Sequence, residues 1–497
     1  MMHYQKGKNR DQVFMTSLDQ MVEADSWARI VDMFVDAMPI ADFGFKNTRL
    51  NKEGNLPYHP ADLFKLLLYG YRKGIRSANK LHEATKVNID VIWLIKGLKP
   101  SPRKICYFRS NNSEAIEKAH RHFVKLLKSW ELIEGKTVAL DGTKINAQNS
   151  LKNNFNQKKI DRHLLYIEGK IQDYLDQLDT IEKSEFSEVT KKKKAKAVEE
   201  KIERSQKRKE EYEDIQKQVN DSSDGQVSRT DPDAKMVIKH RNITEVGYNI
   251  QATADAKHNL LVDVFAGGVN DMYELGRAAK RVQQILGIKH IDLLADKGYH
   301  NGVEIASAER RGVRPFVSPK GSRPQKEAGF RKEDFPYDPH QDTYKCPAGE
   351  HLHRELEFLR GTAKKPYKVR RYGTPKCVDC PLRSQCTTAK AGRKIERPIH
   401  QAYVDRNNAR VNRYKNFYRL RAHIIEHIFG TLKRQWGLTH TLVKGTKNVE
   451  TEYRLAAICY NLKRSLSILG PQALKERLAY LFSVLLAFIS IVFARYE

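Results

Sequence analysis

The stretch KTVALDGTKINA, residues 136–147, decides the fold of this chain. Its apolar and β-branched start predicts a short strand over Thr137–Leu140, which ends at Asp141 and a glycine turn. A strand end places the next side chain at the edge of a sheet, where a site can be open while the scaffold stays rigid. Asp141 is therefore a candidate site residue.

Two segments downstream continue the β pattern. EVGYNIQATADAKHNLLVDVFAGGVND, residues 245–271, predicts two strands joined by a turn, and a helical segment follows it. KHIDLLADKGYHNG, residues 289–302, predicts a buried strand over Ile291–Ala295 that delivers Asp296 at its end. Strands and helices that alternate in this way predict an α/β (mixed α+β) fold, a mixed sheet with flanking helices.

The rest of the chain divides by composition. Apolar residues recur at helical spacing near the N-terminus, and at three- and four-residue spacing in a charged segment, which predicts a long helical hairpin or coiled coil. We expect a helical N-terminal domain over residues 1–130 and a core in two pieces, residues 131–320 and 400–470. A charged helical insertion (157–225) lies within the first piece, and a small basic insertion rich in cysteine (321–399) separates the two pieces. An apolar helix over residues 471–497 follows the core.

The charge of the chain indicates its partner. The sequence holds 89 Lys and Arg against 60 Asp and Glu, a formal net charge of +29. Such an excess attracts polyanions, of which nucleic acid is the commonest, and an enzyme of small molecules or peptides has no need of it. We expect the N-terminal domain, for DNA binding or dimerisation, and the two insertions to bind DNA phosphates.

The two ends of the sequence indicate in which cellular compartment the protein is expected. The start, MMHYQKGKNRDQVF, has no apolar stretch of the kind found in a signal peptide. The run LAYLFSVLLAFISIVFA, residues 478–494, has 17 uncharged residues, which is the short limit for a membrane span. We expect a cytoplasmic protein whose C-terminal helix is buried or self-associating rather than a membrane anchor.

A helical segment, HIIEHIFGTLKRQWG at residues 423–437, supplies a third acid, Glu426. H-x-x-E-H is also a zinc-peptidase signature, in which His423 and His427 would bind the metal. A peptidase needs a further ligand and does not explain the two aspartates or the charge. We therefore expect the histidines to flank a site or to pack.

Asp141, Asp296 and Glu426 form the candidate metal site. Acids from three separate elements can hold two divalent ions that activate a water or a 3′-hydroxyl and stabilise the leaving oxygen in phosphodiester chemistry. Hard oxygen ligands suit Mg²⁺ or Mn²⁺ rather than zinc.

Four cysteines form a second candidate metal site. C-x₂-C with a third cysteine five residues on and a fourth upstream is a set that binds structural Zn²⁺, formed by Cys346, Cys377, Cys380 and Cys386. An iron–sulfur cluster or metal-free thiols are the alternatives. Cys106 and Cys459 lie on apolar helix faces, so we expect them in the core.

Three blocks, ALDGTKINA, LLADKGYHNG and IIEHIFGTLKRQWG, together resemble the DDE transposases of bacterial insertion sequences. The segment HPADLFKLLLYGYRKGIRSANKL resembles the N-terminal domain of one branch of that family, and CYNLKRSL resembles its closing helix. The resemblance implies a ribonuclease-H-like core, a catalytic triad of Asp141, Asp296 and Glu426, and two Mg²⁺ or Mn²⁺ ions.

The same resemblance implies the partners. A transposase binds double-stranded DNA, both the terminal inverted repeats of its element and the target, and acts as a homodimer in a synaptic complex. It hydrolyses the phosphodiester at the element ends and transfers the strand to the target, with no small-molecule substrate. A catalytically inactive DNA-binding relative, or a host nuclease without strand transfer, are the alternatives.

A related family signature has Tyr, Arg, Glu and Lys at fixed intervals. Glu426 and Lys433 fit the last interval, whereas Tyr418 and Arg421 each lie one residue early. On a straight helix Arg419 and Lys433 share the face of Glu426, and Arg421 points aside. The residues expected to contact DNA are Lys433, Arg434, Arg419, Arg421, Tyr418, Lys144 and Lys297.

Overall fold

A computed structural model describes residues 11, 13, 15–48, 56–222, 224–240, 243–320, 329–362 and 365–493. Its central sheet has the strand order β4-β5-β1-β7-β8, and β6 also pairs with β5. β1 is antiparallel to β5, and β5 is antiparallel to β6, whereas β7 is parallel to β1 and β8 to β7. The strands are β1 (Thr137–Asn146), β4 (Lys235–His240), β5 (Ile243–Asp255), β6 (Leu260–Gly267), β7 (Ile291–Ala295) and β8 (Val313–Val317).

The order β6-β5-β1-β7-β8, three antiparallel strands followed by two parallel ones, is consistent with a ribonuclease-H-like core. The predicted mixed α/β class is confirmed. Parallel neighbours need a crossover, and α10 (Gly302–Arg310) provides it between β7 and β8.

The predicted end of the first strand is wrong. β1 runs through Asp141 and Gly142 to Asn146, because each of its residues from Val138 onward pairs with β5. Gly142 lies opposite Gln251 and forms no turn. The parallel pairing with β7, however, stops at Leu140. Asp141 therefore still lies where the sheet opens, but on a continuous strand.

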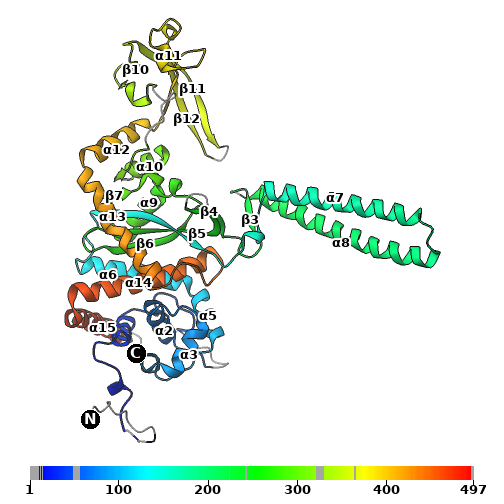
Figure 1. Cartoon of the computed structure of the whole chain (residues 1–497). Helices are drawn as coiled ribbons and strands as arrows, with labels where there is room; N and C mark the ends of the chain where they lie inside the picture. The colour runs from blue at the N-terminus through cyan, green and yellow to red at the C-terminus, as the bar shows by residue number, and fades with distance from the viewer. Residues whose placement is uncertain are drawn as a thin grey trace, which may run out of the picture.

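Helices from both ends of the chain share one core with this sheet. α14 packs on β6, α6 and α2, and α13 crosses β1, β5 and β7 (Figure 1). The helices are α1 (Trp27–Asp36), α2 (Pro60–Arg72), α3 (Ala78–Val87), α4 (Ile89–Leu94), α5 (Pro102–Asn111), α6 (Ser113–Ser129), α9 (Leu275–Leu286), α12 (Gln401–Arg413), α13 (Lys415–Gly430) and α14 (Thr446–Leu469).

A buried carboxylate joins the N-terminal helices to α14. Glu452 accepts a hydrogen bond from the Tyr71 hydroxyl at 3.0 Å, and its Oε1 lies 3.6 Å from Arg109 Nη1 and 3.8 Å from Arg76 Nη1. Its other oxygen accepts from the backbone N–H of Leu442. This network ties α2, α5 and α14 into one body with the sheet.

The charged insertion forms an arm. Figure 1 shows α7 (Gln157–Glu182) and α8 (Glu188–Asp221) as a long antiparallel pair that projects sideways from the body. At its base, β2 (Asn154–Asn156) pairs with β3 (Gln226–Ser228). A small core of Phe155, Ile160, Ile215 and Val219 closes this end. The helical hairpin expected in this segment is present.

The cysteine-rich insertion forms a second, separate sheet at the top of Figure 1. Its core consists of Phe335, Tyr344, Leu352, Tyr372 and Ile395. The elements are β9 (Tyr337–Asp338), β10 (Thr343–Lys345), β11 (His351–Thr362), β12 (Lys365–Gly373), β13 (Ile395–Pro398) and α11 (Arg383–Cys386).

The C-terminal helix α15 (Pro471–Phe493) is buried only in its first part. Leu474 and Leu478 are buried, whereas Tyr480 and Phe482 are exposed. Burial within the chain is therefore wrong for these two positions, and self-association of this helix stays a prediction. Side chains beyond Ala487 and the last residues, from Ala494, lie outside the described part. Within the described residues, no helix meets the length and apolarity needed to cross a membrane.

Candidate active site

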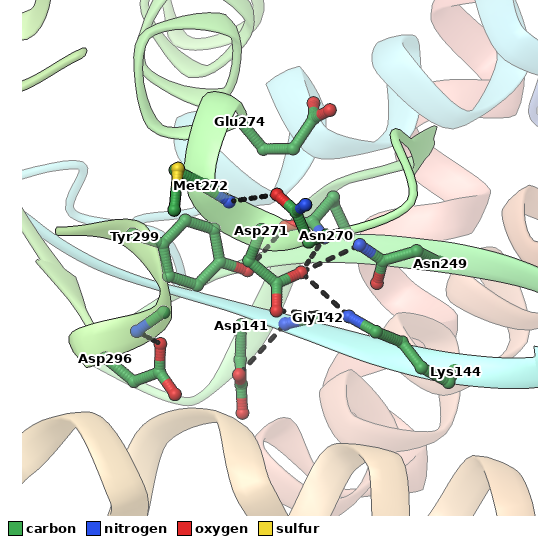
Figure 2. Close-up of polar contacts among 12 residues, drawn as sticks. Asp141, Gly142, Lys144, Asn249, Asn270, Asp271, Met272, Glu274, Asp296 and Tyr299 are labelled. Carbon is green, nitrogen blue, oxygen red and sulfur yellow. Dashed lines mark hydrogen bonds and ion pairs between the residues drawn. The ribbon is translucent and has the colours of Figure 1, made fainter. Parts of the chain in front are cut away.

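The two predicted aspartates lie at the same edge of the sheet, on neighbouring strands (Figure 2). Asp141 lies within β1, and its Oδ1 accepts the backbone N–H of Gly142 at 2.9 Å. Asp296 directly follows β7 and caps the 3₁₀ turn η4 (Lys297–Tyr299), where its Oδ1 accepts the Gly298 N–H at 2.7 Å. Each carboxylate is thus oriented by the backbone N–H of a glycine one or two residues further on.

Arg421 joins Asp141 to Glu426, which corrects the expectation that Arg421 points aside. Its Nη1 lies 3.3 Å from Asp141 Oδ2, and its Nη2 lies 3.1 Å from Glu426 Oε1. The five-residue spacing would separate two short side chains on a helix, but a long arginine can bend back along the surface. The structure therefore brings an arginine next to the first and third acids.

Burial shapes the electrostatics of the pair. Burial is the main cause that raises the pKa of Asp141 to about 6. Arg421 and the Gly142 amide oppose the rise, while the charges of Asp296 and Asp271 add to it. Burial disfavours the charge on Arg421, but the acids, Asp141 first, raise the pKa of its guanidinium. The site therefore holds excess negative charge that favours a cation.

The three acids are not gathered around one point. Within the described residues, no group of three or more His, Cys, Asp and Glu side chains is close enough to share a metal ion. Instead the Arg421 guanidinium is the cation between Asp141 and Glu426, whose side chain is 57% exposed. An all-oxygen set that already binds a cation fits a hard divalent ion.

The helix that carries Glu426 changes its winding before Lys433. α13 ends at Gly430, and residues Thr431–Gln435 form a π-helical turn (η7). Lys433 therefore does not lie on a straight continuation of α13, and its Nζ donates to the Lys144 carbonyl at 3.1 Å. Glu426 and Lys433 still line a common groove of about 750 Å³. Turns of this kind often occur at functional sites.

The other residues predicted to contact DNA differ in exposure. Arg434, Arg419 and Lys297 are exposed, and Arg434 also lines the groove. Tyr418 is half-buried against the core. Lys144 is directed inward, where its ammonium pairs with Asp271.

The histidines have structural partners. His427 Nε2 lies 3.1 Å from the Tyr460 hydroxyl, and its Nδ1 lies 3.1 Å from the His423 carbonyl. Both ring nitrogens of His427 are thus engaged, so it has no free nitrogen for zinc. This arrangement favours the expected flanking role over the peptidase interpretation.

A fourth acid, Asp271, was missed by the sequence analysis. It begins the 3₁₀ turn η3 (Asp271–Tyr273) after β6 and accepts hydrogen bonds from Lys144 and Asn249 (Figure 2). It also accepts a hydrogen bond from Gln251. A signal for it was present in the sequence of β5, where Asn249 and Gln251 are two residues apart and therefore lie on the same face of the strand, opposite Lys144 and Gly142. Two buried amides on one strand indicate a polar partner.

The four clustered cysteines line one small cavity of about 20 Å³ in the upper insertion. Burial is the main cause that raises the pKa of the Cys386 thiol, and the other three cysteines add to it. The described thiols surround this space without forming a metal-binding group of three. Elsewhere, Cys459 is buried as expected, whereas Cys106 is exposed, so its core prediction is wrong.

The sheet makes this a mixed α/β protein, and its strand order is consistent with a ribonuclease-H-like core. Residues 345–466 match a family model described as a transposase DDE domain, and residues 16–111 match one described as a transposase domain (DUF772). The first match includes Glu426 and the four clustered cysteines. The two matches support a DDE transposase of an insertion-sequence type.

One solved structure aligns with the chain, a cryo-EM structure of the piggyBac transposase synaptic complex with hairpin DNA. The identity is 8%, the alignment covers 91% of this chain and 77% of that one, and the TM-score is 0.29. A TM-score this low does not establish a shared fold. No curated protein matches the chain.

Proposed function

We propose that the chain is an active insertion-sequence transposase that cuts the phosphodiester at its element's ends and joins the freed 3′-hydroxyl to target DNA. The observation that carries this proposal is the Asp141–Arg421–Glu426 bridge beside Asp296. Glu426 opens to the groove, and the Arg421 guanidinium is the cation that bridges it to Asp141, so the bridge is arranged to exchange that cation for a metal ion.

Asp141, Asp296 and Glu426 would hold Mg²⁺, or Mn²⁺, in a pair of ions. Such ions polarise the scissile phosphate and lower the pKa of a bound water. The chain itself would orient the acids through the amides of Gly142 and Gly298. With the acids neutralised by ions, the Arg421 guanidinium would be available to bind two phosphate oxygens in a bidentate contact.

DNA binding would concentrate on the core and the basic insertion. The arm carries 16 Lys and Arg against 16 Asp and Glu over residues 157–221, so it adds nothing to the net charge. The insertion over residues 321–399 carries 18 against 10. We therefore assign phosphate contacts to the groove along α13 and to this insertion, and no longer to the arm. A homodimer would present two such surfaces to two element ends.

The cysteine cavity would hold a structural Zn²⁺. Four thiols around a small space suit a tetrahedral soft-ligand ion, which would close the loops that follow β10 and β12. Purified protein should carry about one zinc per chain, and Cys377→Ser with Cys380→Ser should lose it. The exposed Cys106→Ser is the matched control and should keep it. Iron, or no metal, in the wild type would contradict the zinc assignment.

The function is tested with end-labelled DNA that carries the inverted repeats beside the gene, a supercoiled target plasmid and Mg²⁺. We expect cleavage at the repeat end and labelled plasmid products. Cleavage without joined products would identify a nuclease. Binding without cleavage would identify an inactive relative.

A further inference from the structure

The carboxylate of Asp271 lies between the elements that carry the two aspartates. Its Oδ1 accepts from Asn249 Nδ2 and Gln251 Nε2, each at 2.8 Å, and the Lys144 ammonium lies 3.1 Å from both of its oxygens. Asn249 and Gln251 belong to β5 and are almost fully buried, while Lys144 belongs to β1. Asp271 thus fastens β5 to the strand that carries Asp141.

A second set of contacts connects Asp271 to the turn that follows Asp296. Gln251, which donates to Asp271, accepts a hydrogen bond from the buried Tyr299 hydroxyl in η4. A side chain at Gly298 would bring a Cβ within 3.6 Å of Asp271 Oδ2 and 2.8 Å of Asp296 Oδ1. The two carboxylates therefore approach the same backbone from two sides.

The glycine after Asp141 leaves room for this carboxylate. A Cβ at position 142 would lie 2.5 Å from Asp271 Oδ1 and 2.6 Å from Gln251 Nε2. Carbon atoms do not approach polar atoms so closely, so any side chain there would push Asp271 or Gln251 away. Gly142 has an ordinary strand conformation in the register with β5, so close approach, and not backbone freedom, requires a glycine here.

We infer that Asp271 is a positioning residue that sets the spacing of Asp141 and Asp296 and, through its ion pair with Lys144, the net charge beside them. This inference rests on the proposed metal site. The backbone carbonyl of Lys144 also accepts a hydrogen bond from the Lys433 ammonium. Lys144 therefore connects Asp271 to the groove that Lys433 lines. Asp271 acts through these neighbours, because its two oxygens are occupied by Lys144 and the two amides.

The opposite charges of Asp271 and Lys144 allow a test that separates the proposed role from a purely structural one. Asp271→Asn keeps the shape but leaves the Lys144 ammonium uncompensated near the acids, which should weaken Mn²⁺ binding about tenfold. Lys144→Met with Asp271→Asn removes both charges and should return the Mn²⁺ dissociation constant to within about threefold of wild type. Gly142→Ala should weaken binding as well, by displacing the carboxylate.

Asp263→Asn is the matched control. Asp263 is a buried carboxylate on β6 that pairs with Arg281 on α9, so it matches Asp271 as a paired acid of the same core. Its loss should destabilise the fold at least as much as Asp271→Asn and leave Mn²⁺ affinity unchanged. Mn²⁺ affinity is measured by electron paramagnetic resonance on the full chain without DNA, together with thermal unfolding.

A double variant that stays as weak as Asp271→Asn would overturn the inference and would make Asp271 a metal ligand itself. Equal weakening in Asp263→Asn would also overturn it, as a general stability effect. If wild-type protein binds no Mn²⁺, the proposed function fails instead. Hydrogen exchange then decides: we expect Asp271→Ala to speed exchange in β1 and η4, and unchanged exchange there would overturn the positioning role.

Discussion

Glu452 and Glu426 lie on consecutive α-helices, α14 and α13, and have opposite surroundings. Glu452 is fully buried, with a tyrosine, two arginines and a backbone amide as partners. Glu426 is more than half exposed and has one arginine partner, which it shares with Asp141. The carboxylate that holds the fold together is buried and fully paired, whereas the one that we propose for the metal site is open to solvent.

The largest expected effect is on stability. Glu452→Gln should lower the free energy of unfolding by about 3–5 kcal/mol, because it leaves two buried arginines without a counter-charge. Glu426→Gln should change it by less than about 1 kcal/mol, as expected for an exposed pair. Urea unfolding of the full chain measures both. Equal losses in the two variants would remove the distinction between the carboxylates.

The next effect is a gain in the free energy of unfolding, and its size depends on pH. Asp141 has its pKa raised from 3.8 to about 6, so keeping it ionised at neutral pH destabilises the fold. Asp141→Asn should therefore raise stability at pH 7 by roughly 2–3 kcal/mol.

This gain should shrink as the pH falls through 6 and vanish below about 4. In that window the folded wild type takes up a proton that the unfolded chain binds only near its ordinary pKa of 3.8. Thermal unfolding between pH 4 and 8 measures the gain. A variant less stable than wild type at pH 7 would show that Asp141 contributes to the fold in the manner of Glu452.

The smallest expected effect concerns the groove. Lys433→Ala should slow cleavage and reduce the salt slope of DNA binding by about one unit, because it removes one phosphate contact. The Mg²⁺ requirement should stay unchanged. His427→Ala on the same helix is the control and should have the milder effect. Binding assays between 50 and 200 mM salt give the slopes, and identical slopes for wild type and Lys433→Ala would exclude the contact.

The sequence predicted what local patterns control. Short apolar, β-branched runs located the strand that carries Asp141 and the strand that ends before Asp296, and charge with helical spacing located the arm. These features depend on each segment alone. The two matched segments support a DDE transposase of an insertion-sequence type, and the sheet confirms the mixed α/β class, while the roles of the three acids remain predictions.

The errors occurred where distant segments decide the outcome. Gly142 looked like a turn residue, but pairing with β5 keeps it in a strand. Arg421 was judged on a straight helix, yet Asp141, 280 positions earlier, attracts it. Asp271 was missed because its amide partners come from another strand. A single segment does not show which charges a fold brings together.

The measurement that tests the account most directly is cleavage of repeat-end DNA by Asp141→Asn, Asp296→Asn and Glu426→Gln in Mg²⁺. Each change keeps the shape of the side chain and removes the charge that would hold an ion. The account predicts that all three bind the DNA nearly as wild type does and that none cuts it. Cleavage above a few per cent of the wild-type rate in any one would remove that residue from the site.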